Sequence, residues 1–239
     1  MKIVAWTGEM TIDISGTGLQ AAFIGRNGKL ISEHLRTPTP HRCTPDQMLA
    51  KLATLVKPLP VYDHIAIGFP GVVREGRVIT APHFGTDQWS DFELAKTLSR
   101  ALDAPARLIN DAEMQGLAVI HGHGLELVVT LGTGVGTALF TNGKLAPHLE
   151  LAHHPLHGHK TYDEYLGNEE RKRIGDHKWS KRVFKTIGVL HSLLNWDHLV
   201  IGGGNARRIR GNLPEHVTRV QNIAGIEGGA ALWRLKSVH

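Results

Sequence analysis

The sequence predicts an α/β protein in which two copies of one unit follow each other along the chain. Residues 15–30 and 131–145 share a Gly-Thr-Gly turn, an apolar run and an Asn-Gly-Lys-Leu end. Residues 63–68 and 197–202 share an Asp-His pair followed by a short apolar strand that ends in glycine. Because both matches occur in the same order, chance is a poor explanation, and we expect a duplication.

Composition places the chain among ordinary globular proteins. Its 239 residues are 41% hydrophobic and 21% charged, so a sizeable core can form without disulfides. The single cysteine, Cys43, can form neither an internal disulfide nor a thiolate zinc site alone. No apolar run approaches the roughly 18 residues of a membrane span, and residues 1–4 do not resemble a signal peptide. We therefore expect a cytoplasmic protein with no membrane partner.

The charge is basic, with 27 Lys and Arg against 22 Asp and Glu. A positive balance favours anionic partners such as nucleic acid, phosphorylated metabolites or polyphosphate. Many basic proteins bind no polyanion, so the charge alone does not choose among these classes.

In the first copy, a β-hairpin comes first. Residues 10–13 form one strand, Gly16-Thr17-Gly18 the turn, and residues 19–24 the returning strand. Asn27-Gly28 supplies the positive φ of a type I′ turn, which leads into a third strand over 29–36. A helix follows, with Thr44 as N-cap, Pro45 at its first position and an apolar stripe through Leu49, Leu52 and Val56. The strand 63–68 ends the copy.

The second copy repeats this plan with an insertion. Its hairpin turns at Gly132-Thr133-Gly134, Asn142-Gly143 forms the next turn, and a third strand over 144–153 is interrupted by a proline. Residues 178–195 form an amphipathic helix before the strand 197–202. Its apolar face carries Trp179, Val183, Ile187, Leu190 and Leu194, and its basic face carries Lys178, Lys181, Arg182 and Lys185.

Between the copies we expect a helix over 91–102, a strand over 106–109 and a helix over 112–121. The boundary is placed near Asn110-Asp111, which gives two domains, 1–110 and 111–239.

Glycine-rich turns in both copies predict a phosphate site. Glycine allows close approach of the backbone, and successive N–H groups can hold an anion. Asp13, just before the first turn, is a candidate to hold Mg²⁺ through water. Gly202-Gly203-Gly204 follows a buried strand and could admit a nucleotide base or ribose, although a flexible loop is the alternative.

Polar residues elsewhere predict proton transfer and sugar binding. Asp111, at the carboxyl end of a predicted strand, could act as a general base, although it could equally be the N-cap of the next helix. Glu150 and His153, three residues apart, can both bind vicinal sugar hydroxyls. His153, His154, His157 and His159 are grouped, but their spacing matches no closed zinc pattern, and we expect no zinc.

These motifs, taken in order, resemble the ROK sugar kinases, and among them the polyphosphate glucokinases. The resemblance covers roughly residues 10 to 232. It rests on seven segments: 13–18 (DISGTG), 68–71 (GFPG), 110–112 (NDA), 131–136 (LGTGVG), 150–153 (ELAH), 201–204 (IGGG) and 224–230 (AGIEGGA).

The resemblance implies a duplicated, actin-like ATPase (RNase H-like) fold with two domains around a cleft. It implies phosphorylation of glucose on its 6-hydroxyl by polyphosphate, ATP or both, with Mg²⁺ as cofactor, Asp111 as base and a homodimer as assembly. No nucleic-acid partner is expected. The implied sugar-binding residues are Asn110, Glu150, His153, Glu164, Gly71 and His83. The implied donor-binding residues are Asp13, Gly16, Thr17, Gly18, Gly132, Thr133, Gly134, Gly202, Gly203 and Gly204.

The chain also departs from the family pattern. Ser15 replaces a usual Gly, Gln20 a common Lys, His83 a usual Asn and Ala152 a Gly, and the Cys-rich zinc motif of many members is missing. Two other functions therefore stay open: a catalytically weak sugar-binding or sensing protein, and a polyanion-binding protein without catalysis. We expect the basic helix face to guide polyphosphate, with an ordinary solvated face as the alternative.

Overall fold

The computed structural model describes residues 8–25, 29–40, 42–220 and 224–235. The chain divides into two compact units, residues 1–118 with 225–239 (the first unit) and residues 119–224 (the second unit). This division differs from the expected boundary at 110/111, because two helices on either side of the second unit's sequence pack in the first. They are α4 (Asp111–Val119) and α8 (Ala224–Leu232).

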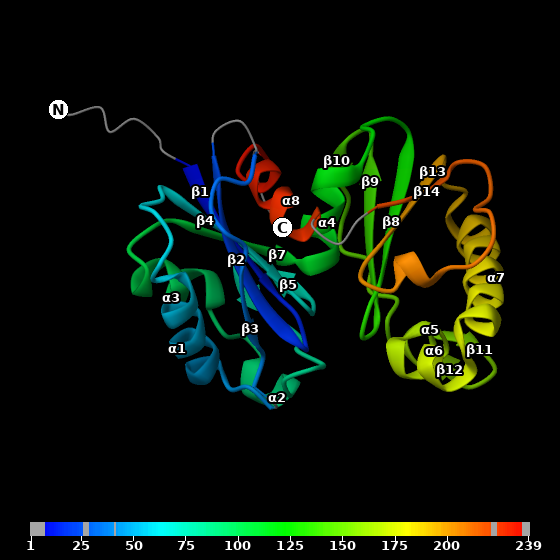
Figure 1. The fold of residues 1–239 in the computed structure, drawn as a ribbon, viewed down its shortest axis with the longest axis horizontal. Helices are drawn as coiled ribbons and strands as arrows, with labels where there is room; N and C mark the ends of the chain where they lie inside the picture. The colour runs from blue at the N-terminus through cyan, green and yellow to red at the C-terminus, as the bar shows by residue number, and fades with distance from the viewer. Residues whose placement is uncertain (1–7, 26–28, 41, 221–223, 236–239) are drawn as a thin grey trace. The chain divides into compact units, whose positions relative to one another are not determined.

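The first unit contains a five-stranded sheet of order β3-β2-β1-β4-β7 (Figure 1). Its strands are β1 (Gly8–Ile14), β2 (Gly18–Gly25), β3 (Leu35–Pro38), β4 (His64–Phe69) and β7 (Ala106–Asn110). The pairs β1–β2 and β2–β3 are antiparallel, and β1–β4 and β4–β7 are parallel.

The second unit contains a sheet of order β10-β9-β8-β13-β14. Its strands are β8 (Leu125–Leu131), β9 (Val135–Thr141), β10 (Lys144–Leu145), β13 (His198–Gly202) and β14 (Val217–Arg219). The order and the directions of the strands are those of the first unit. The predicted duplication is therefore confirmed at the level of sheet topology.

Helices cover both faces of the first sheet (Figure 1). One face packs its apolar residues against α1 (Pro45–Val56) and α3 (Leu94–Ala101). Thr44 and Gln47 cap α1 reciprocally, as the sequence predicts for Thr44. The other face packs against α8 and α4 through small clusters that include Ala22, Ile226 and Met114.

Glycines let α8 lie directly on the first sheet. A Cβ at Gly228 would overlap the carbonyl oxygen of Met114, and one at Gly229 would overlap the Thr11 hydroxyl. Side chains at these two positions would therefore push the helix off the sheet. Helix α8 thus completes the unit that contains β1.

The second unit carries one long helix, α7 (Asp176–Leu194). Its predicted apolar face is confirmed, because Trp179, Val183, Ile187 and Leu190 are buried in the core. Before it come the hairpin β11 (Pro155–His157) and β12 (Lys160–Thr161), and the short helices α5 (Tyr162–Leu166) and α6 (Asn168–Ile174).

The predicted third strands are too long. Residues 29–34 contain only an isolated bridge from Leu30 to Ile24, and β3 begins at Leu35. In the second unit β10 ends at Leu145, because Pro147 cannot donate to a ladder. The turn Asn142-Gly143 has the predicted positive φ values, 49° and 74°, while Asn27-Gly28 lies outside the described residues.

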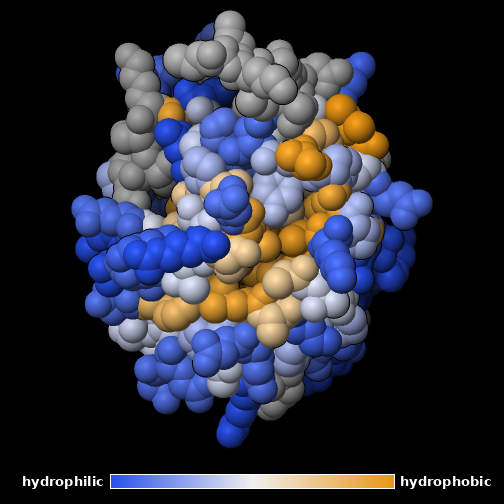
Figure 2. Space-filling view, turned by 90° about the vertical axis from the view of Figure 1, so that its left-hand side faces the viewer, coloured by the Kyte–Doolittle hydropathy of each residue, from blue (hydrophilic) through white to orange (hydrophobic). Residues whose placement is uncertain are grey.

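The surface is mixed in character. Figure 2 shows one side of the molecule, on which an apolar band lies among hydrophilic residues. Five large apolar side chains are exposed in the described part of the chain: Leu30, Ile31, Val61, Val189 and Leu193. None of the helices in the described ranges is long and apolar enough to cross a membrane.

Candidate active site

Asn110 and Asp111 lie where β7 runs into α4. The Asn110 side-chain oxygen accepts hydrogen bonds from the backbone N–H groups of Ala112 (2.9 Å) and Glu113 (3.3 Å). The Glu113 carboxylate accepts in return from the Asn110 N–H (3.1 Å). Asn110 is therefore the N-cap residue of α4, a position that the sequence alone could also assign to Asp111. Half-buried Asp111 is the first residue of the helix.

The Asn110 amide also holds the turn that follows β4. Its Nδ2 donates to the Gly71 carbonyl (3.1 Å) and, at 3.5 Å, to that of Phe69. Gly71 has no room for a side chain, because a Cβ would overlap the Thr80 carbonyl oxygen. Asn110 is 5% exposed, so in this structure it supports the neighbours of Asp111. Its role as a sugar ligand, and that of Gly71, stay predictions.

The first glycine turn is closed by its own residues. Ser15 N–H donates to the Gly18 carbonyl (2.9 Å), and Gly18 N–H donates to the Ser15 hydroxyl (3.1 Å). The ring of His83 lies against this turn, since a Cβ at Gly16 would be 3.0 Å from it. The structure thus brings His83 next to the first phosphate motif.

Asp13 precedes the same turn and is half-buried. Gln20 Nε2 donates to its carboxylate (3.1 Å), and a Cβ at Gly225, at the start of α8, would be 3.0 Å from it. Burial raises the pKa of Asp13 to about 6, and the charge of Arg36 partly opposes this. Mg²⁺ typically takes one or two carboxylates, with waters and substrate phosphates as its other ligands, so a single carboxylate here fits that ion.

In the second unit, the two predicted donor-binding motifs lie together. Asn205 donates from its amide to the Gly132 carbonyl (3.0 Å) and from its N–H to that of Leu131 (2.9 Å). Gly203 has a φ of 83°, and a Cβ there would overlap the backbone of Leu131. Gly203 and Asn205 therefore pack directly on Leu131 and Gly132, and the glycine makes this approach possible.

The predicted sugar pair is in the same unit. Glu150 accepts from the Ala152 N–H (2.9 Å) and from His148 Nε2 (3.4 Å). Burial raises the pKa of Glu150, but these hydrogen bonds and the nearby imidazoles hold it below its usual value. Glu150 is therefore an ionised acceptor at neutral pH, as binding of hydroxyls requires. His153 is exposed.

Two other histidines of the group, His154 and His157, face tyrosines. The rings of His154 and Tyr162 lie 6.3 Å apart and those of His157 and Tyr165 5.2 Å apart, centroid to centroid. Within the described ranges, no group of three or more His, Cys, Asp or Glu side chains could hold a metal ion.

Glu164 has a local role. Its carboxylate accepts from the Thr161 N–H (2.9 Å), while the Thr161 hydroxyl accepts from the Glu164 N–H (3.3 Å), so the two cap α5. Its predicted sugar contact stays a prediction. The residue before it, Asp163, accepts from the Val135 N–H (2.7 Å) beside the second glycine turn. Sequence reasoning missed Asp163, because it lies 28 residues away and belongs to no recognisable motif.

The basic face of α7 is less uniform than expected. Arg182 donates to buried Glu170 (2.7 Å) and to the Tyr165 carbonyl (3.2 Å), and its guanidinium covers the Tyr165 ring. Arg182 therefore has partners within its own unit, and its predicted part in a polyphosphate track stays a prediction. The exposed members of the face are Lys178, Lys181 and Lys185.

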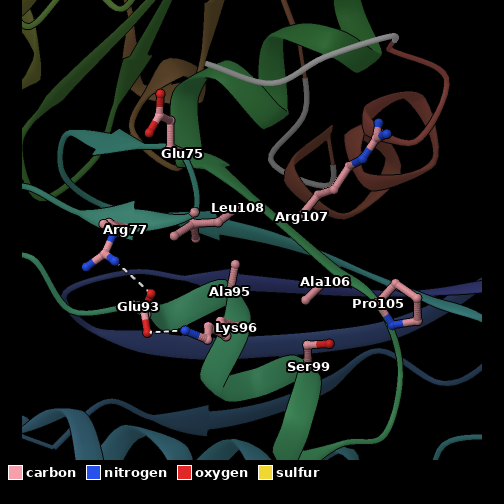
Figure 3. Close-up of a pocket in the computed structure, with 11 residues that line it drawn as sticks. Glu75, Arg77, Glu93, Ala95, Lys96, Ser99, Pro105, Ala106, Arg107 and Leu108 are labelled. Atoms are coloured by element: carbon pink, nitrogen blue, oxygen red, sulfur yellow. Dashed lines mark hydrogen bonds and ion pairs between the residues drawn. The ribbon is translucent and has the colours of Figure 1, made fainter.

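A cavity of about 530 Å³ lies in the first unit, apart from the predicted site residues (Figure 3). Its walls come from α3, β7 and the turn between β5 (Val73–Arg74) and β6 (Arg77–Val78). Glu93 pairs there with Arg77 (2.7 Å) and Lys96 (2.8 Å). Several of its charges are thus bound to one another.

Comparison with known proteins identifies the family. A model described as "ROK family" matches residues 9–168, which is more than half of the chain. The chain belongs to the ROK family. ROK relatives include the polyphosphate glucokinase of Mycobacterium tuberculosis (strain H37Rv), which is 27% identical over 235 residues, or 92% of this chain and 88% of that protein. An N-acetylmannosamine kinase of Escherichia coli is 36% identical over 141 residues, or 57% and 48% of the two chains.

Solved structures of sugar kinases have a similar fold. An inorganic polyphosphate/ATP-glucomannokinase from Arthrobacter sp. strain KM has a TM-score of 0.85 and 28% identity, covering 96% of this chain and 100% of that one. A ROK glucokinase from Streptomyces griseus has a TM-score of 0.78 and 18% identity, covering 94% and 98%. This ROK protein therefore has the actin-like ATPase fold and is a phosphotransferase of the sugar-kinase kind.

Proposed function

We propose that this protein transfers a phosphoryl group from polyphosphate, ATP or both to the 6-hydroxyl of glucose. The observation that carries the proposal is the β7–α4 junction. Asn110 makes the N-cap hydrogen bonds there, and the Asp111 carboxylate, which accepts from the Ala112 N–H (2.9 Å), lies at the carboxyl end of a parallel strand, where open α/β sheets bind ligands. Relatives named as polyphosphate glucokinases and a glucomannokinase support the choice of sugar and donor.

In this proposal the two units contribute different groups. Asp111 accepts the proton of the 6-hydroxyl as its oxygen attacks the terminal phosphoryl group. Glu150, an ionised acceptor, and His153 bind sugar hydroxyls. Backbone N–H groups of the glycine turns stabilise the charge on the transferred group. Mg²⁺ held by Asp13 through water would neutralise part of the donor's charge when bound.

A coupled assay for glucose 6-phosphate, with ATP and then with polyphosphate, tests the function. Asp111→Asn keeps the size and an acceptor oxygen but removes the base, so kcat should fall by about 10²–10⁴ while the melting temperature stays within a few degrees. Asp103→Asn is the matched control, because Asp103 is exposed in the same unit and its φ of 51° suits asparagine.

Two outcomes decide against the proposal. Near-normal turnover in Asp111→Asn would show that Asp111 is not the general base. A wild-type protein that binds glucose in calorimetry but phosphorylates it with neither donor would be a sugar-binding or sensing protein instead.

The polyphosphate part of the proposal rests on α7. Lys178, Lys181 and Lys185 are exposed there, and Arg207, Arg208 and Arg210 are exposed after the 202–204 segment of the same unit. A long polyphosphate carries about one charge per phosphate, so its binding should release counterions and weaken steeply with salt, by analogy with DNA. ATP, with few charges, should depend on salt much less.

Changing Lys178, Lys181 and Lys185 together to Gln should raise the KM for polyphosphate severalfold and leave that for ATP unchanged. The control removes three exposed charges from the first unit, at Lys51, Lys57 and Arg100. Equal salt dependence for both donors, or equal effects of the two triple variants, would leave α7 as a solvated basic face.

A further inference from the structure

Asp163 connects the two parts of the candidate site in the second unit. These parts are the donor turn, Gly132–Gly134, and the sugar segment, Glu150–His153. The Asp163 carboxylate accepts from the Val135 N–H at 2.7 Å, directly after the donor turn. Its own N–H donates to the Ala152 carbonyl at 3.0 Å, inside the sugar segment. Asp163 therefore bonds both to the sugar segment and to the residue that directly follows the donor turn.

The fit between Asp163 and the donor turn requires glycine. A Cβ at Gly134 would be 2.6 Å from both carboxylate oxygens of Asp163. A Cβ at Gly167 would be 2.5 Å from the Asp163 carbonyl oxygen and 2.7 Å from that of Thr133. Gly134 is thus needed where the carboxylate lies against the turn, in addition to any need for close approach by a phosphate.

Helix capping does not explain this carboxylate. Asp163 lies in the first turn of α5, where an acidic residue is common. The capping bonds of that helix, however, are made by Thr161 and Glu164. The Asp163 side chain extends instead to a strand 28 residues earlier in the sequence.

The next helix supports the same turn. The Asn168 N–H, at the start of α6, donates to the carbonyls of Gly132 (3.1 Å) and Thr133 (3.2 Å). Leu149, directly before the sugar segment, is bonded to β9, because the Thr137 hydroxyl donates to its carbonyl. The segment from Asp163 to Asn168 therefore forms the base on which the donor turn rests.

We propose that Asp163 is a positioning residue for phosphoryl transfer, which holds the donor turn in register with the sugar segment. This inference rests on the proposed function, since it assigns the turn to the phosphate donor. A hydrogen bond to a carboxylate is stronger than one between neutral groups, so it restrains the turn well. A misplacement of about 1 Å at a reacting centre can lower a rate by about 10²-fold.

Kinetics give the first test. Asp163→Ala should lower kcat by about 10- to 100-fold and raise the KM for the donor. The KM for glucose should stay within about threefold, because the bond to Ala152 is made by the backbone. Asp163→Asn keeps an acceptor oxygen and should recover most of the activity. Glu169→Gln, on an exposed side chain of α6, is the control and should match the wild type.

Hydrogen exchange gives a test that needs no turnover. In Asp163→Ala, peptides covering residues 131–137 should exchange faster than in the wild type, and in Asp163→Asn they should stay close to it. If the wild-type protein has no kinase activity, the proposed function is wrong. Hydrogen exchange would then still show whether Asp163 holds the donor turn in place. Unchanged exchange at 131–137, or KM values for glucose and donor that rise equally, would overturn the positioning role.

A double-mutant cycle adds a geometric test. Gly134→Ala should displace the carboxylate and resemble Asp163→Ala in donor KM. In the Asp163→Ala background the same methyl group has no carboxylate to meet, so its further effect should be at most about twofold. Fully additive effects would show that Gly134 and Asp163 act independently, against the proposal.

Discussion

The two units carry a glutamate at the same place in their sheets, with different surroundings. Glu9 of β1 lies beside His64 of β4, and Glu126 of β8 lies beside His198 of β13. Both glutamates are almost fully buried, at 1% and 0% exposure. The duplication therefore extends to a buried carboxyl group next to an imidazole-bearing strand.

Their hydrogen bonds differ. Glu126 accepts from the N–H groups of His121 (2.6 Å) and Gly122 (2.7 Å), in the turn before β8, and lies 3.1 Å from His121 Nδ1. Both Glu9 carboxyl oxygens are buried and have no hydrogen-bond partner among the residues that the structure describes. Burial raises the pKa of Glu9 to about 7, and the charge of Arg234 partly opposes this. The strands of the two units thus share the same register at these glutamates. Residues outside the repeated strands determine whether each carboxyl group has hydrogen-bond donors.

Removal of the Glu126 carboxylate should have the largest effect on this comparison. Glu126→Ala leaves buried N–H groups of the 121–122 turn without an acceptor and opens a cavity, so it should lower the free energy of unfolding by about 3 kcal/mol or more. Urea unfolding measures this. Glu9→Ala is the matched variant and should cost clearly less at pH 8, because no donor loses a partner. Equal losses would mean that the two carboxyl groups are equivalent after all.

Glu9→Gln should stabilise the protein at alkaline pH. Because the folded-state pKa is raised, the contribution of Glu9 to stability is fully present below about pH 4.5 and is lost as pH rises through about 7. At pH 8 the charged, buried carboxylate costs about 1–3 kcal/mol, which a neutral amide avoids in part. At pH 4.5 both side chains are neutral and the difference should largely vanish.

Unfolding in urea at both pH values checks this, with Glu126→Gln as the control, which should not gain stability at pH 8. A Glu9→Gln variant that is no more stable than the wild type at pH 8 would show that Glu9 is solvated or paired in solution.

Local patterns in the sequence predicted much of the fold. The two glycine turns, the capped helix at Thr44 and the apolar face of α7 follow from spacing and turn chemistry, and all are confirmed. The return of α8 to the first unit was not predicted. Its cause is the tight fit of Gly228 and Gly229 on residues more than 100 positions earlier, which no local pattern reveals.

In the candidate site, too, contacts between residues that are far apart in the sequence could not be predicted. The resemblance indicated Asn110 and Glu150 as ligands, but not that the Asn110 amide holds the 69–71 turn or that His148 bonds to Glu150. Asp163 and the ion pair of Arg182 with Glu170 depend on tertiary contacts. A basic stripe on a helical wheel cannot show which charges are already paired.

The smallest expected effects concern a pair of aspartates that do match between the units. Asp63 accepts from the Gly8 N–H (3.2 Å) and donates its own N–H to the Gly8 carbonyl (3.0 Å). Asp197 does the same with Leu125, at 2.6 Å and 2.8 Å. In each unit this clasp joins the start of the central strand to the loop before its parallel neighbour. Its side-chain half is the hydrogen bond from the strand's N–H group to the carboxylate.

Asp63→Ala and Asp197→Ala should each lower the free energy of unfolding by about 1 kcal/mol, because the backbone half of the clasp remains. Asp→Asn at either position keeps an acceptor oxygen and should cost about half as much. The two aspartates should thus change stability in the same direction, whereas substitution to Gln at the two glutamates should not. If one Asp→Ala variant destabilises by over about 2 kcal/mol and the other has no effect, the clasp has diverged as the glutamates have. Only the strand register would then be common to both units.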